Sequence, residues 1–247
     1  MAVPTVSEVL DRARELARTT RKWSDRTQRF GVRIIDRRAG ERQRRMGIWV
    51  RKYPDDRLRT LVFFEAPSDV RGVGFLQWAD PHGVDRQWLY LPELKRVRQI
   101  SGAAKSESFA GTDFSYDDLT ILSQLVEWTD QDARAELLRT EGAGPEECYV
   151  IEFTPVAKEL TYGKVAAWFK ADDLTVTRYA MYDRAGRRLK ELLQSDFRPV
   201  GAIPTAFHLE IRNEQTSGTT IVDMSEVQYD TGLDDELFSQ RALERGP

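Results

Sequence analysis

The strongest constraint on the fold is a long series of short segments in which apolar and polar side chains alternate, each separated from the next by turn residues. In one such segment Phe30, Val32 and Ile34 stand at every second position, as in a strand with one buried face. Similar signals lie near residues 45–51, 58–66, 72–78, 86–91, 94–100, 134–140, 148–154, 164–170, 176–182, 189–197, 206–213 and 219–229. Roughly a dozen strands in succession predict one large antiparallel meander that curves, or nearly closes, into a barrel.

Two segments interrupt this series. Residues 6–21 carry apolar side chains at helical spacing, opposite charged ones, and predict an amphipathic helix. Residues 101–129 predict a polar loop followed by a short helix that begins near Ser115. The predicted apolar side of this helix consists of Tyr116, Leu119, Leu122 and Leu125. A hairpin would suffice at this point of a meander, so we expect the excursion to cover an opening in the sheet.

Composition and spacing predict a single, mainly β domain with a few helices. No stretch rich in Pro, Gly or Ser divides residues 1–247, so we assign a helix to residues 1–24 and the curved sheet, with its insertion at 101–129, to residues 25–247. Hydrophobic residues make up 40% and charged residues 31% of the chain, which excludes general disorder. The longest apolar run, near residues 61–64, is far shorter than a membrane span. We therefore expect a soluble protein.

The net charge of -3 conceals an asymmetry. Residues 1–60 contain 17 Lys and Arg against 8 Asp and Glu, whereas the remainder of the chain is acidic. The basic part includes Arg37, Arg38, Arg42, Arg44, Arg45, Arg51 and Lys52. Two interpretations stay open: a patch for phosphate groups or an acidic partner, and the solvated faces of strands. Nucleic acid is not expected as a partner, because the chain as a whole is acidic and no nucleic-acid-binding motif occurs.

Few residues are suited to catalysis. His82 and His208 lack the spacing of metal ligands, and Cys148, the single cysteine, lies in an apolar strand, which excludes a disulfide and a cysteine-based zinc site. Asp113, Asp117 and Asp118 could supply paired carboxylates or oxygen ligands for Ca²⁺. Their spacing matches no EF-hand loop, so helix capping and solvation explain them more simply. We predict no catalytic residue, no metal site and no cofactor.

Aromatic residues are the most distinctive remaining feature, with six Trp, eight Tyr and eleven Phe. Several strands are apolar on both faces, as at residues 61–64. A curved sheet with an apolar concave face needs an apolar filler. The protein's own helices could fill it, or a lipophilic ligand could share it with them; both remain open.

Five short motifs occur in order along the chain. They are FEAPSDVRG at residues 64–72, WLYLPELKRVR at 88–98, FAGTDFSYDD at 109–118, IPT at 203–205 and LDDELF at 233–238. As an ordered set they resemble the outer-membrane lipoprotein-sorting protein family, the LolA-like periplasmic carriers. The resemblance spans about residues 25–243.

This resemblance implies a LolA- or LolB-like fold, an unclosed antiparallel half-barrel with helices as a lid over its mouth. The motif residues Gly111, Asp113, Phe114 and Tyr116 would then belong to the lid. It also implies that the hollow holds acyl chains of lipids or lipoproteins during outer-membrane biogenesis. Export to the periplasm would follow, with Met1 in place of a removed signal peptide. An RND-type inner-membrane transporter or an outer-membrane receptor is the expected partner, and the protein is expected to be a monomer.

Strand parity predicts which residues line the hollow. Arg33, Arg45, Arg51 and Glu65 are polar at odd positions, so the even positions should face inward. The predicted lipid-binding residues are Phe30, Val32, Ile34, Met46, Ile48, Val50, Val62 and Phe64, extended along the same parity to Leu76, Trp88 and Tyr90.

Three hypotheses follow. The first is a non-enzymatic periplasmic carrier of lipids or lipoproteins. The second is an adaptor of a membrane transporter, whose hollow is filled by its own helices and whose basic end docks the partner. The third, an enzyme that uses Asp113, Asp117 and Asp118 on a lipid or glycan, ranks last.

Overall fold

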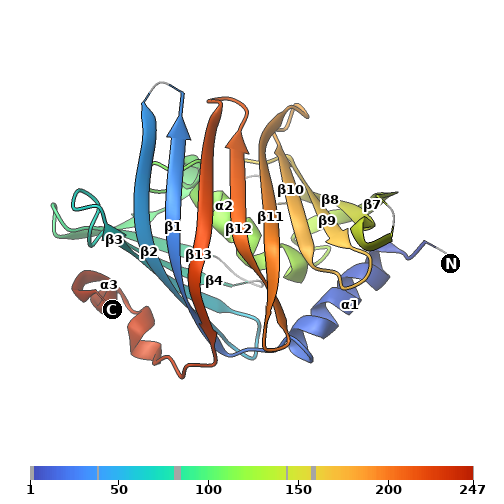
Figure 1. Ribbon diagram of the computed structural model, residues 1–247, viewed down its shortest axis with the longest axis horizontal. Coiled ribbons are helices and arrows are strands. Elements are labelled where there is room, and N and C mark those ends of the chain that lie inside the picture. Colours follow the sequence, from blue (N-terminus) through green and yellow to red (C-terminus); the bar gives the residue numbers. More distant parts are fainter. Residues whose placement is uncertain (1–2, 38, 81–84, 143, 157–159, 247) are drawn as a thin grey trace. The chain divides into compact units, whose positions relative to one another are not determined.

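The computed structural model describes residues 3–37, 39–80, 85–142, 144–156 and 160–246 (Figure 1). Its described part contains a 13-stranded sheet with the order β6-β5-β4-β3-β2-β1-β13-β12-β11-β10-β9-β8-β7. Sequential neighbours pair antiparallel, as β1 does with β2 and β8 with β9. The series begins at β6 and ends at β7, so the sheet is not closed into a barrel. The predicted mainly β, antiparallel and unclosed fold is confirmed.

The chain divides into two compact units. One, the α1 unit, contains residues 1–22 and 126–219; the other, the insertion unit, contains residues 23–125 and 220–247. We describe each by itself, and the predicted single domain stays a prediction.

The α1 unit packs its core in a row across five strands. Its elements are α1 (Val6–Arg18), β7 (Ala133–Glu141), η3 (Gly144–Glu146), β8 (Cys148–Pro155), β9 (Lys164–Lys170), β10 (Val176–Tyr182), β11 (Arg188–Val200) and β12 (Ile203–Asn213). The register places Ile151, Ala167, Tyr179, Leu192 and Ile211 side by side on one face, and all five are buried. Opposed side chains of this kind are the unit of sheet stability.

Helix α1 begins at a capping box. The Thr5 hydroxyl accepts from Glu8 N at 3.3 Å, and the Glu8 carboxylate accepts from Thr5 N at 2.7 Å, which satisfies two amide groups of the first turn. The helix ends at Arg18, earlier than the predicted residue 21. Arg14 on its inner side donates to the carbonyl oxygens of Val126 at 2.9 Å and Trp128 at 2.6 Å.

The insertion unit contains the first six strands and the last. Its elements are β1 (Asp25–Asp36), β2 (Gly40–Lys52), β3 (Leu58–Ala66), β4 (Gly74–Ala79), β5 (Arg86–Leu91), β6 (Arg96–Ile100), η1 (Gly102–Ser106), α2 (Tyr116–Gln124), β13 (Gly218–Tyr229, from Thr220 on), η4 (Asp235–Phe238) and α3 (Gln240–Arg245); η2 (Leu125–Glu127) continues α2 into the other unit. The predicted strands at 86–91, 164–170 and 176–182 match β5, β9 and β10 residue for residue.

Of the four residues predicted for the apolar side of helix α2, Tyr116 and Leu125 are buried, as expected. Tyr116, Thr120, Ile121 and Gln124 are buried, whereas Leu119 and Leu122 are only half-buried. Ser115 is the N-cap, as predicted, and its hydroxyl accepts from Asp118 N at 3.3 Å. Leu119 and Leu122 were assigned wrongly, because the strands beneath the helix present glutamine side chains, which require polar partners such as Thr120. Asp117 and Asp118 are buried, so the expectation that they are solvated was also wrong.

Candidate functional site

The register of β1, β2 and β3 assigns one face of the insertion unit. Phe30 lies opposite Met46, and Met46 lies opposite Phe64, so these side chains share a face. We call it the insertion face, because residues 101–125 pack on it through the contact of Phe109 with Phe64. The predicted residues on this face are Phe30, Val32, Ile34, Met46, Ile48, Val50, Val62 and Phe64. Their common face is confirmed, and their binding of lipid stays a prediction.

The extension of this set to Leu76, Trp88 and Tyr90 was wrong. Leu76 lies opposite Leu61 and Trp88, and Tyr90 lies opposite Gly74. These residues occupy the other face, which we call the C-terminal face because residues 233–246 pack on it. Pairs in β1, β2 and β3 join even positions to even ones, but β3 pairs with β4 even to odd. Even-numbered residues of β1–β3 therefore share the insertion face with odd-numbered residues of β4.

An aromatic cluster joins the insertion to the insertion face. The Phe109 ring lies 5.8 Å from Phe64, 5.2 Å from Phe75 and 5.6 Å from Tyr116, measured between centroids. All four side chains are buried, and tilted or edge-on pairs at these distances are favourable. The insertion itself thus fills this part of the face.

Next to the aromatic cluster lies a polar seam between α2 and strands β4 and β5. Gln87 Nε2 donates to the Tyr116 carbonyl at 3.2 Å and to the Thr120 hydroxyl at 3.2 Å. Gln77 Nε2 donates to the same hydroxyl at 3.3 Å. The seam ends where Gln124 Nε2 donates to Asp85 Oδ1 at 3.0 Å. Two glutamines inside otherwise apolar strands were the sequence signal for this seam, which we had not recognised.

The motif residues lie in the insertion, as the resemblance implied. Gly111 has a positive φ of 75° at an exposed turn, a conformation that glycine adopts without strain. Asp113 receives a hydrogen bond from the Thr220 hydroxyl at 2.7 Å, and its amide donates back to that oxygen at 2.9 Å. Phe114 and Tyr116 are buried. The carboxylate of Asp113 therefore fastens the loop to β13, and its role as a lid stays a prediction.

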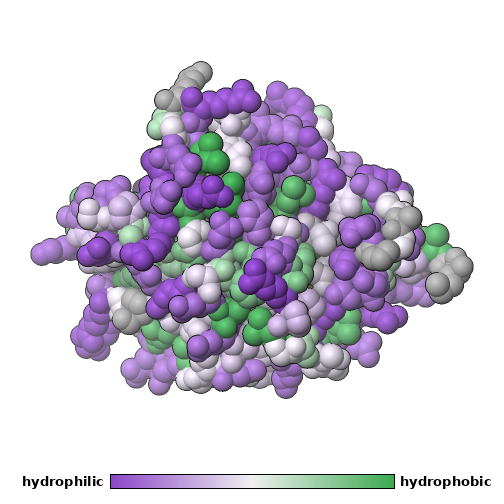
Figure 2. Space-filling model, in the orientation of Figure 1, coloured by the Kyte–Doolittle hydropathy of each residue, from purple (hydrophilic) through white to green (hydrophobic). Residues whose placement is uncertain are grey.

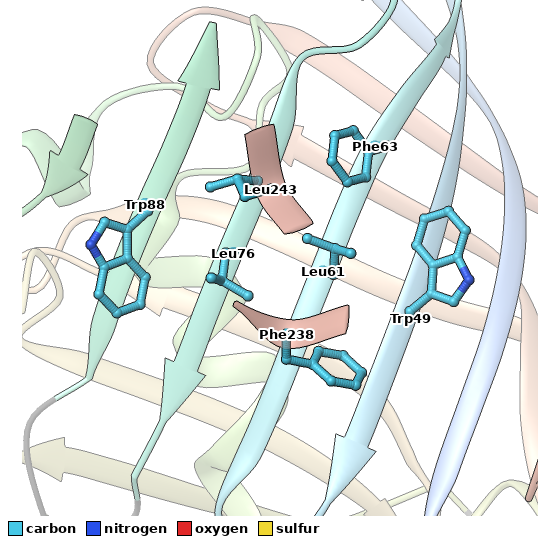
Figure 3. Packing of buried hydrophobic residues seen from close by; sticks show 7 residues of the cluster. All are labelled: Trp49, Leu61, Phe63, Leu76, Trp88, Phe238 and Leu243. Carbon is cyan, nitrogen blue, oxygen red and sulfur yellow. The ribbon is translucent and has the colours of Figure 1, made fainter. Parts of the chain in front are cut away.

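The C-terminal segment covers the opposite face. Phe238 and Leu243 lie over Leu61 and Leu76, between the indole rings of Trp49 and Trp88 (Figure 3). Trp78 Nε1 donates to the Phe238 carbonyl at 2.9 Å. Before this segment, the buried Asp25 carboxylate accepts from the amides of Thr231, Gly232 and Leu233 at 2.7–3.2 Å. Burial raises the pKa of Asp25, but these bonds lower it on balance.

A pocket of about 440 Å³ opens on the C-terminal face beside α3. Arg29 stands in it, 4.9 Å from the centroid of Trp49 and 3.1 Å from Glu65 Oε1. A Cβ at Gly47 would lie 2.2 Å from Arg29 Nη1, so a larger residue there would displace the guanidinium from its present position. The walls also include Glu244 and Arg245. Acidic and basic side chains thus share the walls, and local sequence patterns did not reveal the pocket because its walls come from segments as far apart as Arg29 and Arg245.

The described residues offer little for catalysis. They contain no group of three or more His, Cys, Asp or Glu side chains arranged to hold a metal ion. Cys148 is buried, and burial raises the pKa of its thiol, which disfavours the reactive thiolate. His208 lies in β12, and His82 lies outside the described residues.

The outer surface is predominantly hydrophilic in the view of Figure 2. In the described part of the chain, the large apolar side chains that are exposed are Val3, Ile35, Leu94, Leu138 and Val156. Of the described helices, none combines the length and the apolar composition that crossing a bilayer requires.

Comparison with known proteins places the chain. A family model described as "Uncharacterized protein" matches residues 56–245, well over half of the chain. The chain belongs to that family. Among curated proteins, none matches.

Solved structures with the same fold are more informative. A domain assigned to outer-membrane lipoprotein sorting, from Vibrio parahaemolyticus, is 28% identical, with a TM-score of 0.86 over 96% of this chain and 98% of that chain. A DUF1329 family protein from Desulfovibrio piger is 26% identical, with a TM-score of 0.87 over 98% and 100%. A LolA superfamily protein from Nitrosomonas europaea, 18% identical, shares the fold with a TM-score of 0.73 over 97% and 100%. The resemblance to the lipoprotein-sorting family is confirmed, and the fold is LolA-like.

Proposed function

We propose that this protein is a non-enzymatic carrier that binds the acyl chains of a lipid or lipoprotein on its insertion face and transfers them between membranes across the periplasm. The observation that carries the proposal is the apolar insertion face of β1–β3 under a cover made by residues 101–125. The likeness to the lipoprotein-sorting domain supports the same function.

The physics of transfer suits such a face. Each buried CH₂ of an acyl chain contributes roughly 0.8 kcal/mol, so a chain that replaces part of the insertion gains enough to bind in the micromolar range or tighter. No bond is made or broken, and no catalytic group is required. Met46 and Ile48 are the half-buried members of the face, so a chain would reach them first.

The polar seam favours reversible opening. Hydrogen bonds from Gln77 and Gln87 to Thr120 can be exchanged for bonds to water, at a net cost of about 0.5–1.5 kcal/mol each. Exposing an apolar contact of equal area to water would cost more free energy. The seam therefore lets α2 act as a lid, with an RND-type transporter or an outer-membrane receptor as the partner that exchanges cargo.

Native mass spectrometry of protein exported to a bacterial periplasm tests the proposal. We expect a bound species of lipid mass that is lost on organic extraction. Ile48→Asp should reduce bound lipid at least tenfold, because an acyl chain that packs on the insertion face would have to bury an unpaired carboxylate. Ile35→Asp is the matched control, since Ile35 is exposed and lies on the other face of β1. Equal lipid loading of the two variants would contradict the assignment of the face.

One observation favours a second function. The buried cluster of Phe64, Phe75, Phe109 and Tyr116 already fills part of the insertion face. A protein filled in this way could serve as an adaptor of a membrane transporter with no cargo of its own. The adaptor would be established, and the carrier rejected, by two results. The isolated protein would contain no lipid and bind neither added phospholipid nor lipopeptide, and it would form a stable complex with a membrane protein.

A further inference from the structure

Two arginines interrupt the apolar insertion face at one end. Arg44 lies directly opposite Val32, and Arg42 lies opposite Ile34. Opposed residues share a face, so both guanidinium groups stand beside the predicted lipid-binding side chains. The next arginine of the strand, Arg45, lies opposite Gly31 and belongs to the other face.

Arg44 has hydrogen-bonding capacity that the protein does not use. Its guanidinium lies 5.8 Å from the centroid of Phe64. Its Nε and Nη1 atoms are buried and have no hydrogen-bond partner, although a guanidinium presents five donors. Within the described part of the chain, neither Arg42 nor Arg44 forms an ion pair. Burial lowers the pKa of Arg44; the charge of Asp69 opposes this, and that of Arg42 adds to it.

The turn at Gly111 lies over both arginines. A Cβ at Gly111 would stand 3.7 Å from Arg42 Nη1 and 3.7 Å from Arg44 Nη2, so the two guanidinium groups approach one point from the same strand. Like charges held this close repel each other. A dianionic oxygen group between them would remove the repulsion and accept the unused donors, for which the planar guanidinium fork is well suited.

We propose that Arg42 and Arg44 bind the phosphate group of an anionic amphiphile whose acyl chains lie along Val32 and Ile34. This inference rests on the carrier function and adds the class of cargo. The unused donors of Arg44 and the adjacency of both arginines to the apolar side chains carry it. The Gly111 turn lies beside Nη2 of Arg44, and the unused Nε and Nη1 atoms are buried, so the turn has to lift as the headgroup enters, together with the rest of the insertion.

Two short-chain lipids that differ only in the headgroup test the proposal. Dioctanoyl phosphatidic acid and dioctanoylglycerol would be titrated into the whole protein by calorimetry. We expect the phosphatidic acid to bind at least tenfold more tightly, a difference of about 1.4 kcal/mol. Arg44→Gln should remove most of this preference and leave dioctanoylglycerol binding unchanged. Arg42→Gln should act in the same direction.

Arg45→Gln is the matched control, since it removes the same charge from the same strand on the exposed opposite face. It should leave the preference intact. Equal affinity of the two lipids for the unmodified protein would overturn the proposal. An equal loss in Arg45→Gln and Arg44→Gln would also overturn it, because the effect would then be one of net charge.

Inorganic phosphate separates this proposal from the carrier function. If neither lipid binds, the carrier function fails. In that case an NMR titration tests the anion site alone, through the chemical shift of the Arg44 Nε–H resonance on addition of inorganic phosphate. A shift that is absent in Arg44→Gln would retain a site for free phosphate and reject the amphiphile. No shift would reject the site altogether.

Discussion

Asp85 is a half-buried carboxyl group at the end of the polar seam. Its Oδ1 accepts from Asp80 N at 2.9 Å and from Gln124 Nε2 at 3.0 Å. Burial nevertheless raises its pKa above the ordinary 3.8. A group whose pKa is higher in the folded than in the unfolded state stabilises the fold most at low pH. This contribution is lost as the pH rises from the unfolded pKa through the folded one.

Asp85→Asn should therefore stabilise the protein at neutral pH. The asparagine Oδ1 can accept the same two hydrogen bonds, and the buried charge is removed. We expect a higher free energy of unfolding in urea at pH 7 and no difference at pH 3, where the aspartate is protonated. Asp69→Asn, an exposed carboxylate of the same unit, is the control. A loss of stability in Asp85→Asn at pH 7 would show that the charge itself holds the seam.

At the residue scale, the sequence could assign faces only where alternation is regular. Arginines alternate with apolar residues in β1 and β2, and this alternation indicates which positions share a face. The eight predicted lipid-binding residues of β1–β3 were assigned from it. In β3, residues 61–64 are apolar on both faces, so nothing in the pattern reveals that the parity changes before β4. Leu76 and Trp88 were misassigned for this reason. The position of the Gly111 turn beside Arg44, 67 positions earlier in the chain, could not be predicted from the local sequence.

Among the elements, the C-terminal segment buries one large side chain completely. Phe238 has no exposed surface, whereas its neighbour Leu237 is half-buried. Asp25 fastens residues 231–233 ahead of it. The attachments of the segment thus include an apolar one at Phe238 and a charged one at Asp25.

Phe238→Ala should release this segment or destabilise the whole unit by about 3–5 kcal/mol, the usual cost of removing a buried phenylalanine ring. Hydrogen exchange of residues 233–246 and urea unfolding distinguish local release from global loss. Leu237→Ala, a half-buried neighbour, should cost much less. Unchanged hydrogen exchange in Phe238→Ala would mean that Leu243 and the hydrogen bond from Trp78 Nε1 to the carbonyl of residue 238 suffice to hold the segment.

At the element scale, periodicity located the helices but could not orient α2. An apolar stripe of Leu119 and Leu122 indicated one buried side. The helix instead turns Thr120 and Gln124 toward the sheet, where the side-chain amides of Gln77 and Gln87 donate to Thr120 and Gln124 donates to Asp85. Only the pairing of distant segments reveals these hydrogen bonds.

For the whole molecule, the uneven charge of the sequence is partly neutralised internally. Arg51 pairs with Asp235 at 3.1 Å, and Lys52 pairs with Asp56 at 3.3 Å. Of the basic residues near the β1–β2 turn, Arg37, Arg42 and Arg45 are exposed, and Arg38 lies outside the described residues. Arg37, Arg42 and Arg45 therefore place three exposed cationic groups at one end of that hairpin.

Salt should weaken the encounter with anionic surfaces. We expect the association rate with vesicles containing phosphatidylglycerol to fall severalfold between about 50 and 500 mM NaCl, because screening shortens to a few ångströms over that range. Stopped-flow fluorescence of the tryptophans measures the rate. Vesicles of phosphatidylcholine alone are the control. A rate that is independent of salt for both compositions would show that the basic end does not steer binding.

The strand series could be predicted because turns and alternation are local signals, whereas the unclosed form of the sheet was expected from the family resemblance of the five motifs. The order of strands could not be predicted, since β1 is placed beside β13 by pairing that no local pattern encodes. The division into two compact units likewise depends on which segments return to one another.

The neighbourhood of β1 and β13 has a consequence for how the chain acquires its structure. Ser225 donates to the Arg29 carbonyl across 196 positions of sequence. Strands β1 to β6 can form ladders from adjacent hairpins as they are synthesised, but β1 has no second neighbour until the last strand exists. Contacts of such high sequence separation form slowly, and an edge without its neighbour invites pairing between chains. The β1 edge therefore stays without its second neighbour until β13 has been synthesised.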